Sequence, residues 1–160
     1  MKKYIFTGET KVVKGITLHR IVAVRSFSNV KEGDIGGWIE KEENLSHNGD
    51  CWVYDDAQVY GNAQVYGNAW VYGYAKVYGN AHVYNKAEIW DNAEVYDDAW
   101  VYDNVSVSGN AHVYGNAGVF GNAKVHGNAE VYGDTEVCGN AEVCGDAVVC
   151  GDAEVCDNAK

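Results

Sequence analysis

Apolar and polar residues alternate in a six-residue pattern from Cys51 to the end of the chain. Valine, replaced once by isoleucine, recurs at every sixth position from Val53 to Val155, in eighteen consecutive units without an insertion. Alanine stands two residues before almost every valine, the exceptions being Cys51, Val105 and Thr135. Tyrosine most often follows the valine, and a Gly-Asn or Asp/Asn pair completes the unit, so the consensus is A-x-V-Y-G-N.

This spacing predicts short β-strands separated by tight corners. Alanine and valine are two residues apart, so in a strand both point to one side, while the x and tyrosine positions point to the other. A four-residue strand and a two-residue corner make up the unit, and Gly and Asn suit the corner because they tolerate positive φ. A helix is disfavoured, because a period of six does not fit 3.6 residues per turn and the Gly-Asn pairs would interrupt it.

Three units close a triangular coil of 18 residues, so the fold class predicted is all-β, a parallel β-helix of about six coils. Three Ala-Val faces converge on a narrow axis, which explains why one of the two inward residues is small. One inward column is expected to contain Val53, Val71, Ile89, Val107, Val125 and Val143.

The first 32 residues do not follow the repeat. Short strands are predicted at Lys3–Phe6, Lys11–Val13 and Ile16–Val24, with turns at Thr7-Gly8-Glu9 and around Gly15. Because a solenoid needs its end covered, we predict a β cap at 1–32 and a hexapeptide-repeat β-helix at 33–160. A separate binding module at 1–32 is the alternative.

The first coil is expected to begin near Gly33. Ile39 and Leu45 precede Cys51 by twelve and six residues, so both lie on the inward grid of the repeat. At the other end the chain stops at Lys160 still in register with the repeat. The last coil is therefore expected to present an open edge of parallel strands.

The motif V-Y-G-N-A-x resembles the hexapeptide motif of left-handed β-helices, and the resemblance implies a left-handed coil. The segment GDIGGWIEKEENLSHNGDCWVYDDAQVYGNA (Gly33 to Ala63) resembles the start of the YdcK-like proteins. These are bacterial and prophage hexapeptide-repeat proteins that are often labelled acyltransferases without a demonstrated reaction. The resemblance covers nearly the whole chain; it implies the fold strongly and an activity only weakly.

Residues 18 apart are expected to stack on the outside of the coil, where aromatic side chains form columns. These columns stabilise a solenoid with a thin core, and contiguous aromatic surface also serves as an interaction site; the two roles are compatible. The proposed binding residues are Tyr60, Tyr78, Tyr96, Tyr114, Tyr132, Trp52, Trp70 and Trp90. Outward pairs such as Lys76 with Glu94 and His112 with Glu130 are expected to be solvated cross-strand pairs.

The formal charge of −11 is unevenly distributed. Residues 1–50 carry eight Lys/Arg against seven Asp/Glu (net +1), and residues 51–160 carry four against sixteen (net −12). An acidic solenoid repels phosphate backbones, so no nucleic-acid partner is expected. No stretch is long and apolar enough for a signal peptide or a membrane span, so we expect a cytoplasmic protein with its five cysteines reduced.

His82, His112 and His126 are the candidates for a general base, because acyltransferases of the hexapeptide class use a histidine. Each lies at an ordinary outward position, and no loop interrupts the repeats to hold an acyl donor. We therefore predict no catalytic residue and no cofactor.

The cysteines near the C-terminus repeat every six residues, so they occupy successive faces. Only Cys138 and Cys156 stack directly, at about one strand spacing, which is compatible with a disulfide. Two sulfurs do not complete a zinc site, so no metal is predicted.

The leading hypothesis is a non-enzymatic binding or scaffold protein that acts through its aromatic faces and self-association. The alternatives are a hexapeptide acyltransferase-like enzyme and a phage-encoded sponge or inhibitor of a host defence nucleotide signal or protein. The expected partner is a second copy of the chain, in a trimer or an end-to-end dimer. A protein or a nucleotide-like ligand is the further expectation.

Overall fold

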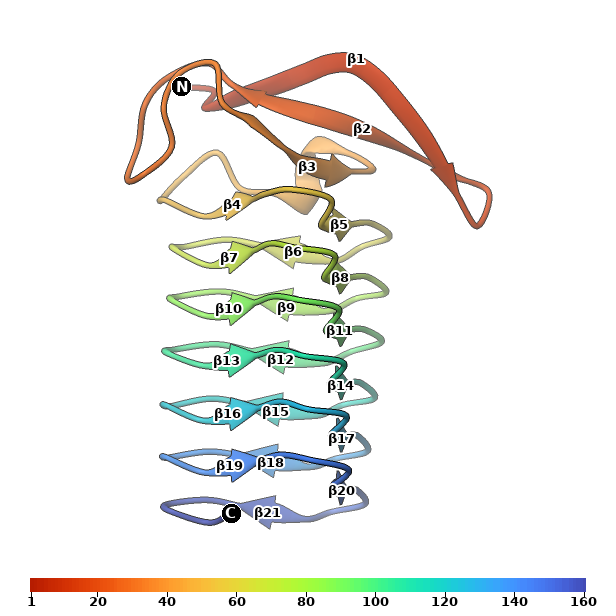
Figure 1. Cartoon of the computed structure of the whole chain (residues 1–160), viewed down its shortest axis with the longest axis vertical. Helices are drawn as coiled ribbons and strands as arrows, with labels where there is room; N and C mark the ends of the chain where they lie inside the picture. The colour runs from red at the N-terminus through yellow and green to blue at the C-terminus, as the bar shows by residue number, and fades with distance from the viewer.

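The repeats form three parallel sheets, one on each side of a triangular coil, in the computed structural model, which describes residues 1–160 (Figure 1). The first face consists of β3 (Ile35–Ile39), β5 (Gln58–Val59), β8 (Lys76–Val77), β11 (Glu94–Val95), β14 (His112–Val113), β17 (Glu130–Val131) and β20 (Val148–Val149). The second face consists of β4 (Trp52–Val53), β7 (Trp70–Val71), β10 (Glu88–Ile89), β13 (Ser106–Val107), β16 (Lys124–Val125) and β19 (Glu142–Val143). The third face consists of β6 (Gln64–Val65), β9 (His82–Val83), β12 (Trp100–Val101), β15 (Gly118–Val119), β18 (Glu136–Val137) and β21 (Glu154–Val155).

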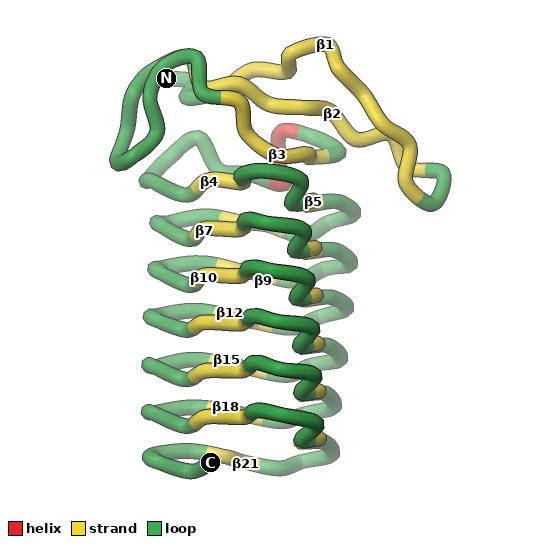
Figure 2. Tube along the Cα trace, viewed as in Figure 1, coloured by secondary structure: helices red, strands yellow, loops and turns green.

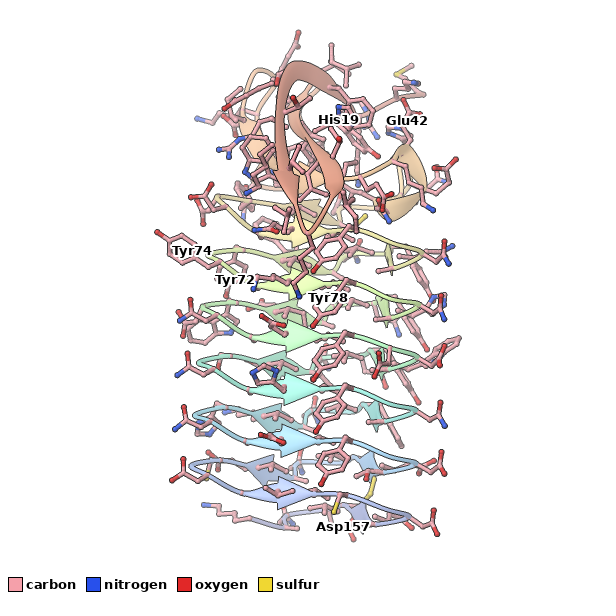
Figure 3. All side chains as sticks on the ribbon, turned by 90° about the vertical axis from the view of Figure 1, so that its right-hand side faces the viewer. His19, Glu42, Tyr72, Tyr74, Tyr78 and Asp157 are labelled. Atoms are coloured by element: carbon pink, nitrogen blue, oxygen red, sulfur yellow. A yellow bond between two sulfur atoms is a disulfide. The ribbon has the colours of Figure 1, made fainter.

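The coil is left-handed, as the resemblance implies. Followed toward the C-terminus in Figure 1, the chain crosses the near side from left to right and the far side from right to left while it descends. The strands of the first face run from left to right when that face is turned toward the viewer (Figure 3), which agrees with this hand.

Each regular strand is two residues long, not four as predicted from the spacing. The bond from the N–H of Ala75 to the carbonyl of Tyr72 (3.4 Å) shows the reason, since the alanine and tyrosine positions close the corner turn. The extended backbone still bonds to the next coil, as Trp70 N donates to Ala87 O (2.9 Å) and Tyr72 N to Ile89 O (3.0 Å). Short strands and broad corners alternate along the whole solenoid (Figure 2).

The core is the predicted valine and alanine stack. Every member of the column from Val53 to Val125 is completely buried, and Val143 near the last coil is 4% exposed. Thr135, which replaces an alanine, is also buried, and its hydroxyl is satisfied by donating to the carbonyl of Tyr132 (2.6 Å). The predicted inward register is therefore confirmed.

The N-terminal cap is an antiparallel hairpin of β1 (Tyr4–Val13) and β2 (Ile16–Ala23), which continues the first face in the order β1-β2-β3-β5. The turn expected at Thr7-Gly8-Glu9 was wrong, because these residues lie within β1. The pairing is irregular between Phe6 and Thr10, and Gly8 absorbs the irregularity with φ 92°. The turn around Gly15 is confirmed.

The first coil is two residues longer than the others. Ile39 and Leu45 are completely buried as predicted, but they align with Val59 and Val65, 20 residues away. They therefore occupy valine positions and not the alanine positions that the 18-residue grid assigned to them. The 3-10 helix η1 (Glu42–Asn44) and the following loop contain no repeat that would maintain the shorter spacing.

A buried lysine ties the cap to the first complete coil. The side chain of Lys3 is completely buried, and its Nζ donates to the carbonyl oxygen of Cys51 at 2.6 Å. Nζ also lies 5.0 Å from the ring centroid of Phe27, and burial lowers the pKa of Lys3. The cap shares one core cluster with the valine stack, which favours a structural cap over a separate module. No helix of the structure has the length and apolar character needed to span a membrane.

Candidate functional site

Four tyrosines form a continuous ladder on the first face, which we call the tyrosine ladder: Tyr78, Tyr96, Tyr114 and Tyr132. Their ring centroids are 4.8–4.9 Å apart and the planes differ by 2–12°, so the rings stack in parallel. All four are half-buried, so each is partly exposed to solvent. Figure 3 shows this column of rings below the labelled Tyr78.

The fifth tyrosine of this column has a different environment. Tyr60 stacks on Tyr78 at 5.0 Å but is only 4% exposed, because it packs with Leu18 and Trp38 beneath the hairpin. The cap therefore covers the top of the column. Tyr60 is not available to a ligand in this structure.

A regular hydrogen bond connects the aromatic columns to the outward x positions of the next coil. The side chain after the valine donates to the residue 16 positions later, as from Tyr78 to Glu94 (2.9 Å) and from Tyr114 to Glu130 (3.2 Å). Tyr72 and Glu88 on the second face repeat the pattern (3.3 Å). Each of these glutamates is thereby held against an aromatic ring.

These contacts keep the tyrosines protonated. Burial and then the Glu130 carboxylate raise the pKa of Tyr114 to about 12, and burial with Glu88 raises the pKa of Tyr72 to about 12. Burial and Glu94 raise the pKa of Tyr78 as well. The ladder is thus a neutral aromatic strip in which the hydroxyls of Tyr78 and Tyr114 act as donors, which suits binding better than proton transfer.

The three predicted tryptophans all lie on the second face, Trp52 in β4, Trp70 in β7 and Trp90 directly after β10. Trp70 lies 5.2 Å from Tyr54, and Trp90 stacks on Tyr72 at 6.0 Å. Tyr54, Trp70 and Tyr72 line an open hollow of about 350 Å³. Trp52 is completely buried against the cap and is not available to a ligand.

The third face holds an aromatic residue that the sequence analysis did not select. Trp100 is 44% exposed, and one side of its ring stacks on His82 at 4.4 Å. It lies at an outward x position, as Trp52 and Trp70 do, but on the face from which none of the proposed binding residues came. A tryptophan at a position otherwise filled mostly by polar residues was the available signal.

The three histidines lie on three different faces, so the structure does not bring them together. His82 is in β9 of the third face, His112 in β14 of the first, and His126 follows β16 of the second. Burial lowers the pKa of His82. His126 Nε2 lies 2.8 Å from Glu142 Oε1, in the same 16-residue relation as the tyrosines.

Cys138 and Cys156 are joined in a disulfide, with Cα atoms 4.5 Å apart, as their stacking allows. For this pair the expectation of reduced cysteines does not hold in the structure. Cys144 and Cys150 are free and exposed, and Cys51 is free and buried.

Two groups of side chains that the sequence analysis missed have the spacing of metal ligands. His126, Glu142 and Cys144 form one, and Cys138, Glu154 and Cys156 form the other. In the first, hydrogen bonding to His126 lowers the pKa of Glu142, with contributions from Lys160 and Lys124. These two ammonium groups oppose a divalent cation there. In the second group, Cys138 and Cys156 are joined in the disulfide, so their sulfurs are not available as thiolate ligands.

Predicted cross-strand pairs are confirmed in part. Lys76 and Glu94 form an ion pair of 2.7 Å between adjacent coils. His112 and Glu130 are register neighbours, but Glu130 accepts its hydrogen bond from Tyr114.

Comparison with known proteins finds a family of similar repeats. Residues 57–73 and 63–77 match the model of the YdcK Beta solenoid repeat. The Escherichia coli (strain K12) protein named "Uncharacterized acetyltransferase YdcK" is 35% identical over 63 residues, which cover 34% of this chain and 19% of that protein. The match therefore spans about a fifth of the relative's length, and the similarity is distant.

Proposed function

We propose that this chain, which contains β-solenoid repeats of the YdcK type, works by binding and not by catalysis. It would act as a scaffold that self-associates through its tyrosine ladder. The observation that supports this is the ladder itself, a flat strip of four parallel rings on the first face. Rigid, half-buried aromatic side chains are enriched in protein interfaces, because they contribute large contact area at a small cost in conformational entropy.

A second copy fits this strip because the two surfaces share one repeat distance. Because the coils of both copies have the same rise, side chains that meet at one coil also meet at every other coil when two solenoids lie side by side. A contact of this kind closes into a ring under cyclic symmetry, and we propose a trimer. An end-to-end dimer is the alternative outcome of the test.

The double substitution Tyr96→Glu with Tyr114→Glu is expected to dissociate this assembly. Two carboxylates at the centre of the interface would lose their hydration without gaining a partner. The self-association constant is expected to fall about 100-fold or more. Sedimentation equilibrium of the wild-type and variant chains between 1 and about 100 µM would measure it.

The matched control carries the same two added charges elsewhere, as Asn29→Glu with Gln64→Glu, both at exposed positions outside the first face. It is expected to associate like the wild type, and circular dichroism checks that each variant is folded. A wild-type chain that sediments as a monomer of 17.5 kDa throughout would overturn the proposal. An assembly that survives the ladder substitutions would point to end-to-end pairing instead.

The name of the Escherichia coli relative favours one further candidate, an acetyl transfer reaction. The triple variant His82→Gln, His112→Gln and His126→Gln tests it. Because these histidines lie on separate faces, we expect no acetyl-CoA consumption above the buffer rate from either chain and unchanged self-association. Turnover by the wild type that disappears in the folded triple variant would support the enzyme in place of the scaffold.

A further inference from the structure

The third face contains a gap in its outward column. From β6 to β21 this column contains Gln64, His82, Trp100, Gly118, Glu136 and Glu154, each one coil below the previous residue. Gly118 is the one glycine among the x positions of all the repeats. A Cβ built there would meet no atom within 4 Å, so the layer between Trp100 and Glu136 is open.

The gap leaves one face of an indole ring uncovered. His82 stacks on Trp100 with ring centroids 4.4 Å apart, which covers one side of the ring. The other side is directed along the column, over Gly118. Trp100 and Glu136 are two strand spacings apart, roughly 9.5 Å, which leaves room for one layer the thickness of a side chain.

The carboxylate below the gap lacks the partner that equivalent glutamates have. Glu88, Glu94 and Glu130 each accept a hydrogen bond from the tyrosine 16 residues earlier. For Glu136 that residue is Phe120, which has no hydroxyl. Glu136 is exposed and accepts no hydrogen bond from the rest of the chain.

The surroundings complete a concave site. Trp100, Phe120 and Glu136 line an open hollow of about 390 Å³. The carboxylate of Asp134 lies at its corner and is held by a hydrogen bond from Asn116 Nδ2 (2.7 Å). An aromatic face, a gap of one layer and two carboxylates are the elements that bind a planar cation.

The cap already contains a bound guanidinium of this kind. The Arg20 guanidinium lies over the ring of Trp38 at 4.9 Å, and its Nη1 is 3.3 Å from the carboxylate of Asp56. A tryptophan face and an aspartate thus hold an arginine within this molecule. Trp100 and Glu136 present the same two groups without an occupant from this chain.

We propose that the layer over Gly118 is a binding slot for an arginine side chain of a partner protein. The guanidinium stacks on the free face of Trp100 and pairs with the carboxylate of Glu136. The net charge of −12 over residues 51–160 attracts a basic partner to this surface. The partner is a different protein, because both arginines of this chain, Arg20 and Arg25, lie against aromatic rings of the cap.

The slot lies on the third face and the tyrosine ladder on the first, so this site adds to the proposed self-association and does not depend on it. Each can fail while the other holds. Sedimentation tests the ladder, and titration with an arginine peptide tests the slot.

The test is a titration of the full chain with the peptide acetyl-Gly-Arg-Gly-Arg-Gly-amide and its lysine analogue, followed by NMR. The five tryptophan indole N–H signals report on separate sites, and Trp100→Phe identifies the signal of interest. We expect the arginine peptide to shift the Trp100 signal and to bind about threefold or more tightly than the lysine peptide.

Three variants separate the slot from general charge attraction. Gly118→Leu fills the open layer without strain and is expected to abolish the Trp100 shift. Glu136→Gln is expected to weaken binding about fivefold. Glu154→Gln removes the same charge one coil further on and is expected to change the affinity less than twofold.

Three outcomes would overturn the proposal. They are a Trp100 signal that does not move with the arginine peptide, a folded Gly118→Leu chain that binds normally, and equal effects of Glu136→Gln and Glu154→Gln. Thermal melting of each variant by circular dichroism establishes that it is folded.

Discussion

Replacing Val107 by aspartate is expected to abolish cooperative folding of the solenoid. Val107 is completely buried on the second face between Ile89 and Val125, on an axis lined by alanine and valine. A carboxylate there has no partner and no water, and its burial costs about 4 kcal/mol or more. That is a large part of the 5–15 kcal/mol that stabilises a typical domain. Because each coil contacts only its neighbours, a defect in the middle also divides the stack in two.

The adjacent residue provides the matched control. Ser106 is half-buried with its side chain outward, and its register neighbours Glu88 and Lys124 carry opposite charges. Ser106→Asp is therefore expected to change the free energy of unfolding by less than about 0.5 kcal/mol. Thermal and urea unfolding followed by circular dichroism would compare the two variants. A soluble Val107→Asp chain that melts at the wild-type temperature would contradict the assigned register.

Replacing Gly121 by valine is expected to produce the second large loss of stability. Gly121 lies at a corner with φ +77°, and a Cβ there would approach the backbone N and O of Gly139 to 2.9 Å. The left-handed conformation costs an ordinary residue about 1–2 kcal/mol, and the collision with the next coil adds about 1–3 kcal/mol. A β-branched side chain is the least tolerant of this conformation.

Asparagine at the same position is the control. Asn85 and Asp103 precede Gly121 in the same corner column, with φ of 59° and 64°. Asparagine brings the same Cβ toward Gly139, but it tolerates left-handed backbone, so Gly121→Asn is expected to cost about 1–2 kcal/mol less than the valine variant. Urea midpoints of the two variants give the comparison. Equal midpoints would show that the conformation of the corner does not limit stability.

The sequence predicted which side chains of the candidate surface stack on one another, but not which of them are exposed to solvent. The spacing of 18 placed Tyr78 above Tyr96 and Lys76 beside Glu94, because identical coils must repeat identical contacts. It could not show that Trp52 and Tyr60 are buried, since the hairpin that covers them lies outside the repeat.

The gap over Gly118 was missed for a related reason. In the sequence Gly118 is one glycine among 19, and its meaning depends on which residues lie one coil above and below it. Only after the third face is assembled does Trp100 have a free side and Glu136 lack a donor. The binding residues proposed from the sequence all lie on the first and second faces, and none belongs to the outward column of the third.

The sequence by itself determined the period, the inward column and the stacking partners, because a six-residue repeat with alternating burial allows only one register. The tertiary structure alone decided the left-handed coil, since the spacing of inward residues is the same for either hand. It also decided the 20-residue first coil, in which Ile39 meets Val59, because the loop after η1 has no repeat to maintain the grid. The hydrogen bonds over 16 residues run diagonally, as from Tyr78 to the residue two positions before its counterpart Tyr96, and they depend on side-chain directions that only the assembled solenoid defines.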